Sequence, residues 1–247
     1  MKESRRIAVM SDIHGNLEAF RTVLGDIDTL GIERIVNLGD IVGYGPDPQS
    51  CADLVRERGI ETVMGNHEQG LINQMYLSRF NPVARDMLLK TRALLDDETV
   101  QWLITRPKSL SLDNMRFVHG APPDLVGEYL WKYSDRYGDL MHAFPEHVCF
   151  VGHTHELRHI VLDHDTSSCR KLCAGTVTLT ADAKHIVNAG AVGQPRGNGP
   201  DAKYVLYDPA SGELEIRFLP YDTQTTAEKI RRAGFHPALA DRILRGC

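Results

Sequence analysis

The chain has 247 residues, of which 42% are hydrophobic and 25% are charged, and it carries a formal net charge of −5 at pH 7. These are ordinary values for a globular protein, so they argue against a disordered chain or a fibrous repeat. The mild excess of acidic residues gives no electrostatic footprint for nucleic acid, and the chain has no polybasic patch for a membrane surface.

Short apolar runs alternate with amphipathic segments in the first half of the chain, a pattern typical of strands followed by helices. Three runs predict strands, at residues 7–10, 35–38 and 61–64. Helices are expected between them, at residues 16–30 and 49–58. Two or three more are expected between residues 68 and 105, and the last of these begins at three consecutive acidic residues, 96–98.

From residue 108 the pattern changes to a succession of short strands, many of them separated by turn signals. These strands are expected at residues 109–112, 116–118, 148–151, 158–162, 170–173, 176–180, 185–187, 202–207 and 214–218. Two short helices are expected at residues 225–233 and 237–244. A strand–helix first half and a strand-rich second half predict two packed sheets flanked by helices, in one domain spanning residues 1–247.

Five of the predicted strands are followed at once by Asp, His or Asn. In chain order these residues are Asp12 and His14, Asp40, Asn66 and His67, His119, and finally His153 and His155. Any one of them has a structural explanation, because Asp and Asn are common in turns and at helix starts. Ligands bind beyond the carboxyl ends of strands in open α/β sheets, so five such ends together favour a single site.

The residue types at these strand ends indicate a metal centre. Apart from His67 they comprise two Asp, one Asn and four His, with no thiolate. Oxygen and imidazole ligands suit Mn²⁺, Fe, Zn²⁺ or Ni²⁺ rather than a soft metal. A catalytic metal usually takes three protein ligands and a water, so seven side chains fit two metals sharing one carboxylate. Such pairs of metals serve displacement at phosphorus.

The blocks resemble the signature of calcineurin-like metallophosphoesterases, complete and in the family's order. They are Asp12-x-His14, Gly39-Asp40, Gly65-Asn66-His67-Glu68, His119 and Gly152-His153-Thr154-His155. Residues 188–196 and the closing Tyr221-Asp222 with two helices resemble a small bacterial and archaeal phosphodiesterase branch. Ala189 and Ala191 depart from that branch, which often has Pro and Ser there. The resemblance implies an α/β (α+β) fold, a four-layer αββα sandwich of two mixed sheets flanked by helices.

The resemblance also implies a role for each residue. One metal would be held by Asp12, His14, Asp40 and His155, and the second by Asp40, Asn66, His119 and His153. Asp40 and a water or hydroxide would bridge the two divalent ions, of which Mn²⁺ is expected first. His67 would stay off the metals as general acid, since a departing alkoxide needs a proton and imidazole titrates near working pH.

The expected activity is therefore hydrolysis of phosphoric esters, as a phosphodiesterase or phosphatase with in-line attack of a metal-bridging hydroxide. Within the enzyme class the alternatives are a phosphomonoesterase, a protein serine/threonine phosphatase and a dinucleoside polyphosphate hydrolase, because loops rather than metals choose the substrate. A non-catalytic metal-binding scaffold is a further alternative. It would need an impaired site, whereas His67 and all seven expected ligands are present.

Two features bear on the substrate, which we expect to be a small phosphorylated compound such as a nucleotide. Residues 121–137 follow His119 and carry Tyr129, Trp131, Tyr133 and Tyr137, which could stack a nucleobase or could pack a lid or a subunit contact. Arg196 could contact a phosphate oxygen or a neighbouring loop. No oligomeric state follows from the sequence.

A cytoplasmic location is expected. The apolar run at residues 7–10 is too short for a signal peptide or a membrane span. The five cysteines are odd in number, scattered and without a CxxC pair, so neither a disulfide framework nor a thiolate zinc site is predicted. Reduced thiols in a cytosolic protein are the simpler interpretation.

Overall fold

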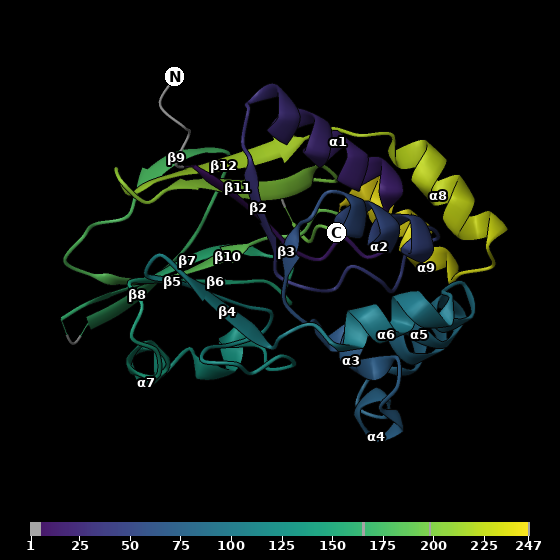
Figure 1. Ribbon diagram of the computed structural model, residues 1–247, viewed down its shortest axis with the longest axis horizontal. Helices are drawn as coiled ribbons and strands as arrows, with labels where there is room; N and C mark the ends of the chain where they lie inside the picture. The colour runs from purple at the N-terminus through teal and green to yellow at the C-terminus, as the bar shows by residue number, and fades with distance from the viewer. Residues whose placement is uncertain (1–5, 165, 198, 247) are drawn as a thin grey trace.

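Two six-stranded mixed sheets lie face to face in the computed structural model, which describes residues 6–164, 166–197 and 199–246 (Figure 1). The first sheet has the order β3-β2-β1-β11-β12-β9, with β1 Ile7–Met10, β2 Arg34–Asn37, β3 Glu61–Thr62, β9 Gly175–Thr178, β11 Ala202–Asp208 and β12 Glu213–Leu219. The second has the order β4-β5-β6-β10-β7-β8, with β4 Ser109–Leu112, β5 Met115–Val118, β6 Val148–Val151, β7 Leu157–Asp163, β8 Thr166–Lys171 and β10 Lys184–Ala189.

Both sheets contain a parallel core. β1, β2 and β3 pair in parallel in the first sheet, and β5, β6 and β10 do so in the second. The remaining pairs are antiparallel. Because parallel strands end at the same edge of a sheet, the segments that follow β1, β2 and β3 are brought together, and so are those that follow β5 and β6.

Side chains alternate between the two faces of each sheet. Each sheet therefore packs against the other sheet on one face and against helices on its outer face, which gives a four-layer sandwich of helices and sheets. In β1, Ala8 and Met10 face the helices on the outside of the first sheet, while Ile7 and Val9 face the second sheet. In β6, Phe150 packs between the sheets, where its ring stacks on Phe117 with centroids 5.4 Å apart. Residues two apart on a strand share a face, so each strand contributes to two apolar layers.

Helices cover the outer faces. They are α1 Leu17–Thr29, α2 Pro48–Glu57, α3 Asn66–Gly70, α4 Gln74–Leu77, α5 Pro82–Ala93, α6 Asp97–Ile104, α7 Tyr137–His142, α8 Thr223–Arg232 and α9 Pro237–Arg245, with a 3-10 turn at Leu130–Tyr133. Figure 1 shows α1 against the first sheet and α7 against the second. Within the described residues, no helix combines the length and apolar composition needed to cross a bilayer.

The predicted fold class is confirmed, and the differences from the sequence prediction are local. The strand expected at 170–173 is wrong: β8 spans Thr166–Lys171 instead, pairing with β7 as a hairpin. All residues of β8 are exposed, so no apolar alternation marked it. The short helix α7 was not expected. The assignment of residues 1–247 to one domain stays a prediction.

Candidate metal centre

All eight site residues predicted from the sequence lie together where the two sheets meet. Asp12 and His14 follow β1, Asp40 follows β2, Asn66 and His67 follow β3, His119 follows β5, and His153 and His155 follow β6. None of the eight is more than 7% exposed. Two carboxylates and five imidazoles are thus withdrawn from water at one place, which is costly unless they bind charged partners.

Five of these residues adopt a left-handed backbone conformation that L-amino acids other than Gly rarely use. They are Asp12, His14, Asp40, His153 and His155, with φ between 49° and 64°. Main-chain hydrogen bonds between the loops hold this conformation: the amide of Asp12 donates to Gly39 O at 3.1 Å, and that of His14 donates to Asp40 O at 2.9 Å. Unusual backbone of this kind concentrates at functional sites.

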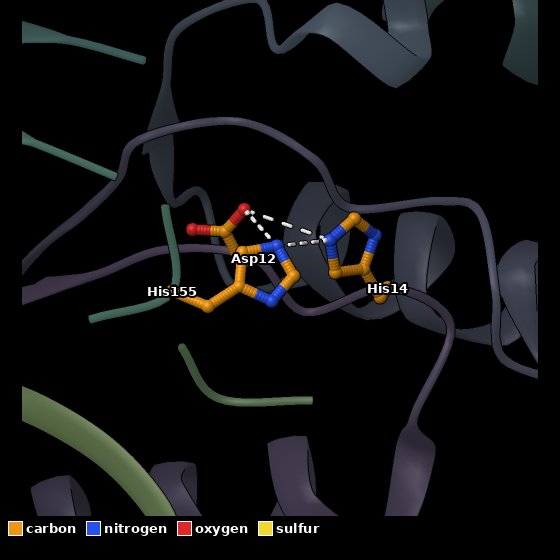
Figure 2. Close-up of side chains that lie close together, drawn as sticks. All are labelled: Asp12, His14 and His155. Atoms are coloured by element: carbon orange, nitrogen blue, oxygen red, sulfur yellow. Dashed lines mark hydrogen bonds and ion pairs between the residues drawn. The ribbon is translucent and has the colours of Figure 1, made fainter. Parts of the chain in front are cut away.

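Asp12, His14 and His155 form the first cluster, in which the three side chains point toward one another (Figure 2). Asp12 Oδ1 lies 3.2 Å from His155 Nε2 and 3.5 Å from His14 Nε2. The two Nε2 atoms are 3.1 Å apart. The other nitrogen of each ring points away from the cluster and donates to a main-chain carbonyl. His14 Nδ1 donates to Val42 O at 3.0 Å, and His155 Nδ1 donates to Gln194 O at 2.6 Å.

This hydrogen-bonding pattern leaves the first cluster without protons on its inner side. Since a carbonyl can only accept, Nδ1 carries the proton in each neutral ring, and both Nε2 atoms present lone pairs. Asp12 Oδ1, also facing this point, has no hydrogen-bond donor in the described part of the chain. Opposed lone pairs repel, whereas a cation between them would satisfy all three atoms. The donor set therefore fits a metal ion.

The second cluster contains Asp40, His119 and His153, with Asn66 beside them. His119 Nε2 lies 3.2 Å from Asp40 Oδ2 and 3.0 Å from Asn66 Oδ1, while its Nδ1 donates to Leu38 O at 2.8 Å. His153 Nε2 is buried and has no hydrogen-bond partner among the described residues. It is an available ligand atom within 4.8 Å of the others.

Protonation of this cluster also indicates that the site binds positive charge. Burial would raise the pKa of Asp40, but the imidazoles of His119 and His67 outweigh burial and hold that pKa below its usual value. Burial would lower the pKa of His119, but Asp40 reverses this and raises it to about 9. A proton on His119 therefore neutralises Asp40 where a metal ion would do so instead.

His67 lies next to both clusters rather than inside one. Its Nε2 is 4.0 Å from Asp40 Oδ2, and it forms a third potential metal group with His14 and Asp40. Its ring contacts those of Tyr44 and Phe80, with centroids 4.6 and 5.1 Å away. Burial lowers the pKa of His67 to about 3, despite the opposing charge of Asp40. The geometry is compatible with a ligand or with a proton donor.

Glu68 is a site residue whose role the sequence analysis missed. Its carboxylate is 1% exposed and accepts hydrogen bonds from three main-chain amides, those of Asp40, Val42 and Gly65, at 2.8, 3.3 and 2.8 Å. It thereby ties the segment after β2 to the segment after β3. An acid three residues after Gly65, at the start of α3, is the signal that could have shown it.

Residues 188–196 support the loop that carries His153 and His155. The side-chain Nδ2 of Asn188 donates to Gly152 O at 2.7 Å and to Thr154 Oγ1 at 3.0 Å. Gln194 supplies the carbonyl that fixes the ring of His155. This is the segment that resembled the phosphodiesterase branch, and its contacts explain why its shape matters to the metal centre.

A pocket of about 540 Å³ opens over the clusters. Residues 69–84 form one wall, residues 124–132 form the other, and Arg196 and Tyr44 lie beside the floor. Tyr129 stacks on the ring of His153, with centroids 4.1 Å apart and an interplanar angle of 23°. Trp131 stacks on Tyr129, at 5.5 Å and 25°. A volume of this order suits a small organic ligand.

The four aromatic residues expected to bind a base or pack a lid have different positions. Tyr137 is buried in the apolar layer under the second sheet, and Tyr133 packs against the same layer. Tyr129 stacks on both His153 and Trp131, and it lines the pocket. Trp131, 60% exposed, is the most accessible of the four rings.

Three comparisons place the chain among known proteins. Residues 6–212 match the model of the calcineurin-like phosphoesterase superfamily domain. A protein of Methanocaldococcus jannaschii, MJ0912, is 35% identical over 250 residues, which is 97% of this chain and 98% of that protein. The crystal structure of a metallophosphoesterase from Sphaerobacter thermophilus has a TM-score of 0.84 and 33% identity, covering 98% of this chain and all of that chain. A Pyrococcus horikoshii protein, PH1004, shares the fold, with a TM-score of 0.77 and 18% identity, covering 98% of each chain.

The first prediction concerns metal content. After loading with Mn²⁺, the protein should carry two ions per chain by elemental analysis, because each cluster offers its own buried ligands. Asp40→Ala should reduce binding at both clusters, whereas His155→Ala should mainly affect the cluster of Asp12 and His14. A single ion in the wild-type protein would refute the dinuclear arrangement.

The second prediction concerns the stacking of Tyr129 on His153. Tyr129→Ala should weaken Mn²⁺ binding to the cluster of His119 and His153 by about 3- to 10-fold, the worth of one aromatic pair. Tyr129→Phe should retain wild-type affinity because the ring is kept. Titration against a chromophoric chelator measures both, with Tyr133→Ala as the control for removing a nearby ring. Unchanged metal affinity in Tyr129→Ala would assign Tyr129 to the pocket wall alone.

Proposed function

Since the chain belongs to the calcineurin-like phosphoesterase superfamily, we propose that it hydrolyses phosphoric esters using two divalent metal ions. The observation that carries the proposal is the first cluster, where two imidazole Nε2 atoms 3.1 Å apart and an unpartnered carboxylate oxygen share one point with no proton between them. Asp12, His14, Asp40 and His155 would hold one ion. Asp40, Asn66, His119 and His153 would hold the other.

The chain's own residues prepare this centre for catalysis. When bound, the metal ions supply a water of lowered pKa as nucleophile and neutralise charge on the phosphoryl oxygens. The carbonyls of Leu38, Val42 and Gln194 fix the tautomers and orientations of three histidines. Glu68 holds the main chain around Asp40. The centre is thus positioned before substrate arrives.

His67 is the residue we assign to proton donation. The leaving alkoxide of an alkyl or nucleoside ester must be protonated as its bond to phosphorus breaks, and imidazole suits that task. Burial favours the neutral ring in the free protein. The negative charge of a bound phosphate ester beside His67 would raise its pKa and favour the imidazolium that donates. His67 therefore acquires its proton with the substrate.

The proposed substrate is a phosphodiester or a small phosphorylated compound, and the pocket has the volume for a nucleotide. A base would stack on Tyr129, which lines the pocket, or on Trp131 beside it, which is 60% exposed. Stacking on a single residue of this kind would contribute to KM for nucleotide esters and leave simple aryl esters unaffected.

The proposed function is tested with two chromogenic esters. Mn²⁺-loaded protein should hydrolyse bis(p-nitrophenyl) phosphate, p-nitrophenyl phosphate or both, and a chelator should abolish the activity. The ratio of the two rates decides between diester and monoester preference. Hydrolysis of neither ester, with Mn²⁺ or Ni²⁺ supplied and both ions bound, would favour the non-catalytic scaffold.

The general-acid role makes a separate prediction for His67→Ala. Nitrophenolate departs without a proton, whereas an alkoxide of high pKa requires one in the transition state. The variant should therefore lose about 10²- to 10⁴-fold in kcat on alkyl or nucleoside esters, and distinctly less on nitrophenyl esters.

Metal analysis of the same variant provides the control. His67→Ala should keep both ions, since loss of a ligand would depress hydrolysis of every ester alike. Loss of an ion, or equal losses on the two classes of leaving group, would show that His67 is a ligand or a phosphate-positioning residue.

A further inference from the structure

Arg196 is a cation in the pocket that no anion in the structure balances. It is half-buried and lines the pocket beside Asp40, His153 and His155. It makes no hydrogen bond or ion pair with any described residue, whereas Lys132 on the pocket wall is paired with Glu128 at 3.0 Å.

Tyr44 also lines the pocket, and its hydroxyl is a potential donor. Its ring packs against those of His14 and His67, with centroids 4.8 and 4.6 Å away. The ring lines the same pocket as Arg196, and within the described residues its hydroxyl has no hydrogen-bond partner. The ring is half-buried, so the hydroxyl remains accessible and can donate to a ligand in the pocket.

The backbone turn centred on Tyr44 has the same conformation as the turn centred on His153. In both places a three-residue turn is closed by the amide of residue i+2 on the carbonyl of residue i: Gly45 on Gly43 O and Thr154 on Gly152 O, each at 2.7 Å. The central residue has φ of 61° at Tyr44 and 64° at His153. Turns of this kind are rare and strained.

Packing keeps the Tyr44 turn in this conformation. A Cβ at Gly43 would collide with the ring of His67, so the turn can lie against that ring only because residue 43 is Gly. When packing maintains a strained backbone at a site, the side chain of the strained residue is usually needed there. At the His153 turn the requirement is a candidate metal ligand, and at the Tyr44 turn it is a hydroxyl beside the same clusters.

We propose that Arg196 and Tyr44 bind non-bridging oxygens of the substrate phosphate next to the metal clusters. The inference rests on the proposed function. A guanidinium beside bound divalent cations experiences repulsion that only an anionic ligand relieves, and it matches phosphate oxygens with two parallel donors. Coulomb attraction grows with ligand charge, so Arg196 contributes more to a dianionic monoester than to a monoanionic diester.

The test is Arg196→Gln, compared with Arg21→Gln, which removes the same charge from the exposed face of α1, outside the pocket. Mn²⁺-loaded Arg196→Gln should bind inorganic phosphate about 10- to 100-fold more weakly by calorimetry. KM for p-nitrophenyl phosphate should rise by a similar factor, and KM for bis(p-nitrophenyl) phosphate should rise less. Arg21→Gln should bind phosphate nearly as the wild type does.

Two further variants separate binding from packing. Arg196→Lys should recover part of the affinity, because the charge is kept and the two-pronged geometry is lost. Tyr44→Phe, which keeps the ring and removes the hydroxyl, should weaken phosphate binding by a smaller factor than Arg196→Gln. Both should retain two metal ions by elemental analysis.

The inference is overturned if Arg196→Gln binds phosphate like the wild type, if Arg21→Gln loses as much, or if Arg196→Gln loses metal. It fails separately from the proposed function. If the wild-type protein hydrolyses neither ester, the proposed function is lost, but phosphate calorimetry on the same variants still decides whether Arg196 binds the anion.

Discussion

The structure depends on one constraint: carboxylates and imidazoles are buried together with their potential metal-binding atoms facing inward. Main-chain carbonyls impose this arrangement, because Leu38, Val42 and Gln194 each take the Nδ1 proton of one histidine. The opposed Nε2 atoms cannot satisfy one another. Without a cation, Asp40 keeps a proton on His119 in its place, as the raised pKa of His119 shows. The fold therefore holds a set of candidate ligands whose negative charge a cation would balance.

Satisfying that constraint shapes the backbone around the site. Five of the converging residues lie in the left-handed region, where an L-residue costs roughly 1–2 kcal/mol, and hydrogen bonds between loops of both sheets hold them there. Close approach of these loops needs residues without side chains. A Cβ at Gly39 would lie 2.5 Å from the amide nitrogen of Gly65, so the segments after β2 and β3 could not meet around Glu68. Stability given up at these positions is recovered in the apolar layers that the two sheets and their helices enclose.

Features that depend on local sequence patterns could be predicted, whereas features that depend on contacts between distant segments could not. The strand ends were predictable, because an apolar run followed by Asp or His is a local pattern, and the topology brings such ends together. The bounds of strand β8 were not predicted, because all its residues are exposed and it pairs only with β7. The function of Glu68 and the stacking of Tyr129 on His153 depend on segments distant in the chain, which local periodicity does not report. Whether the clustered residues act as metal ligands stays a prediction that metal analysis decides.

Chemistry and selectivity have separate origins in this molecule. The candidate ligands come from strand ends that the two sheets hold rigidly, whereas the pocket walls come from residues 69–84, residues 124–132 and Arg196, which belong to connections between strands. Connections tolerate substitution better than strand ends do, so the choice of ester can change while the metal centre is kept. Tyr129 links the two, because its ring is at once part of the pocket wall and the support of His153. A substitution there would alter substrate preference and metal affinity together, which constrains how far this wall can diverge.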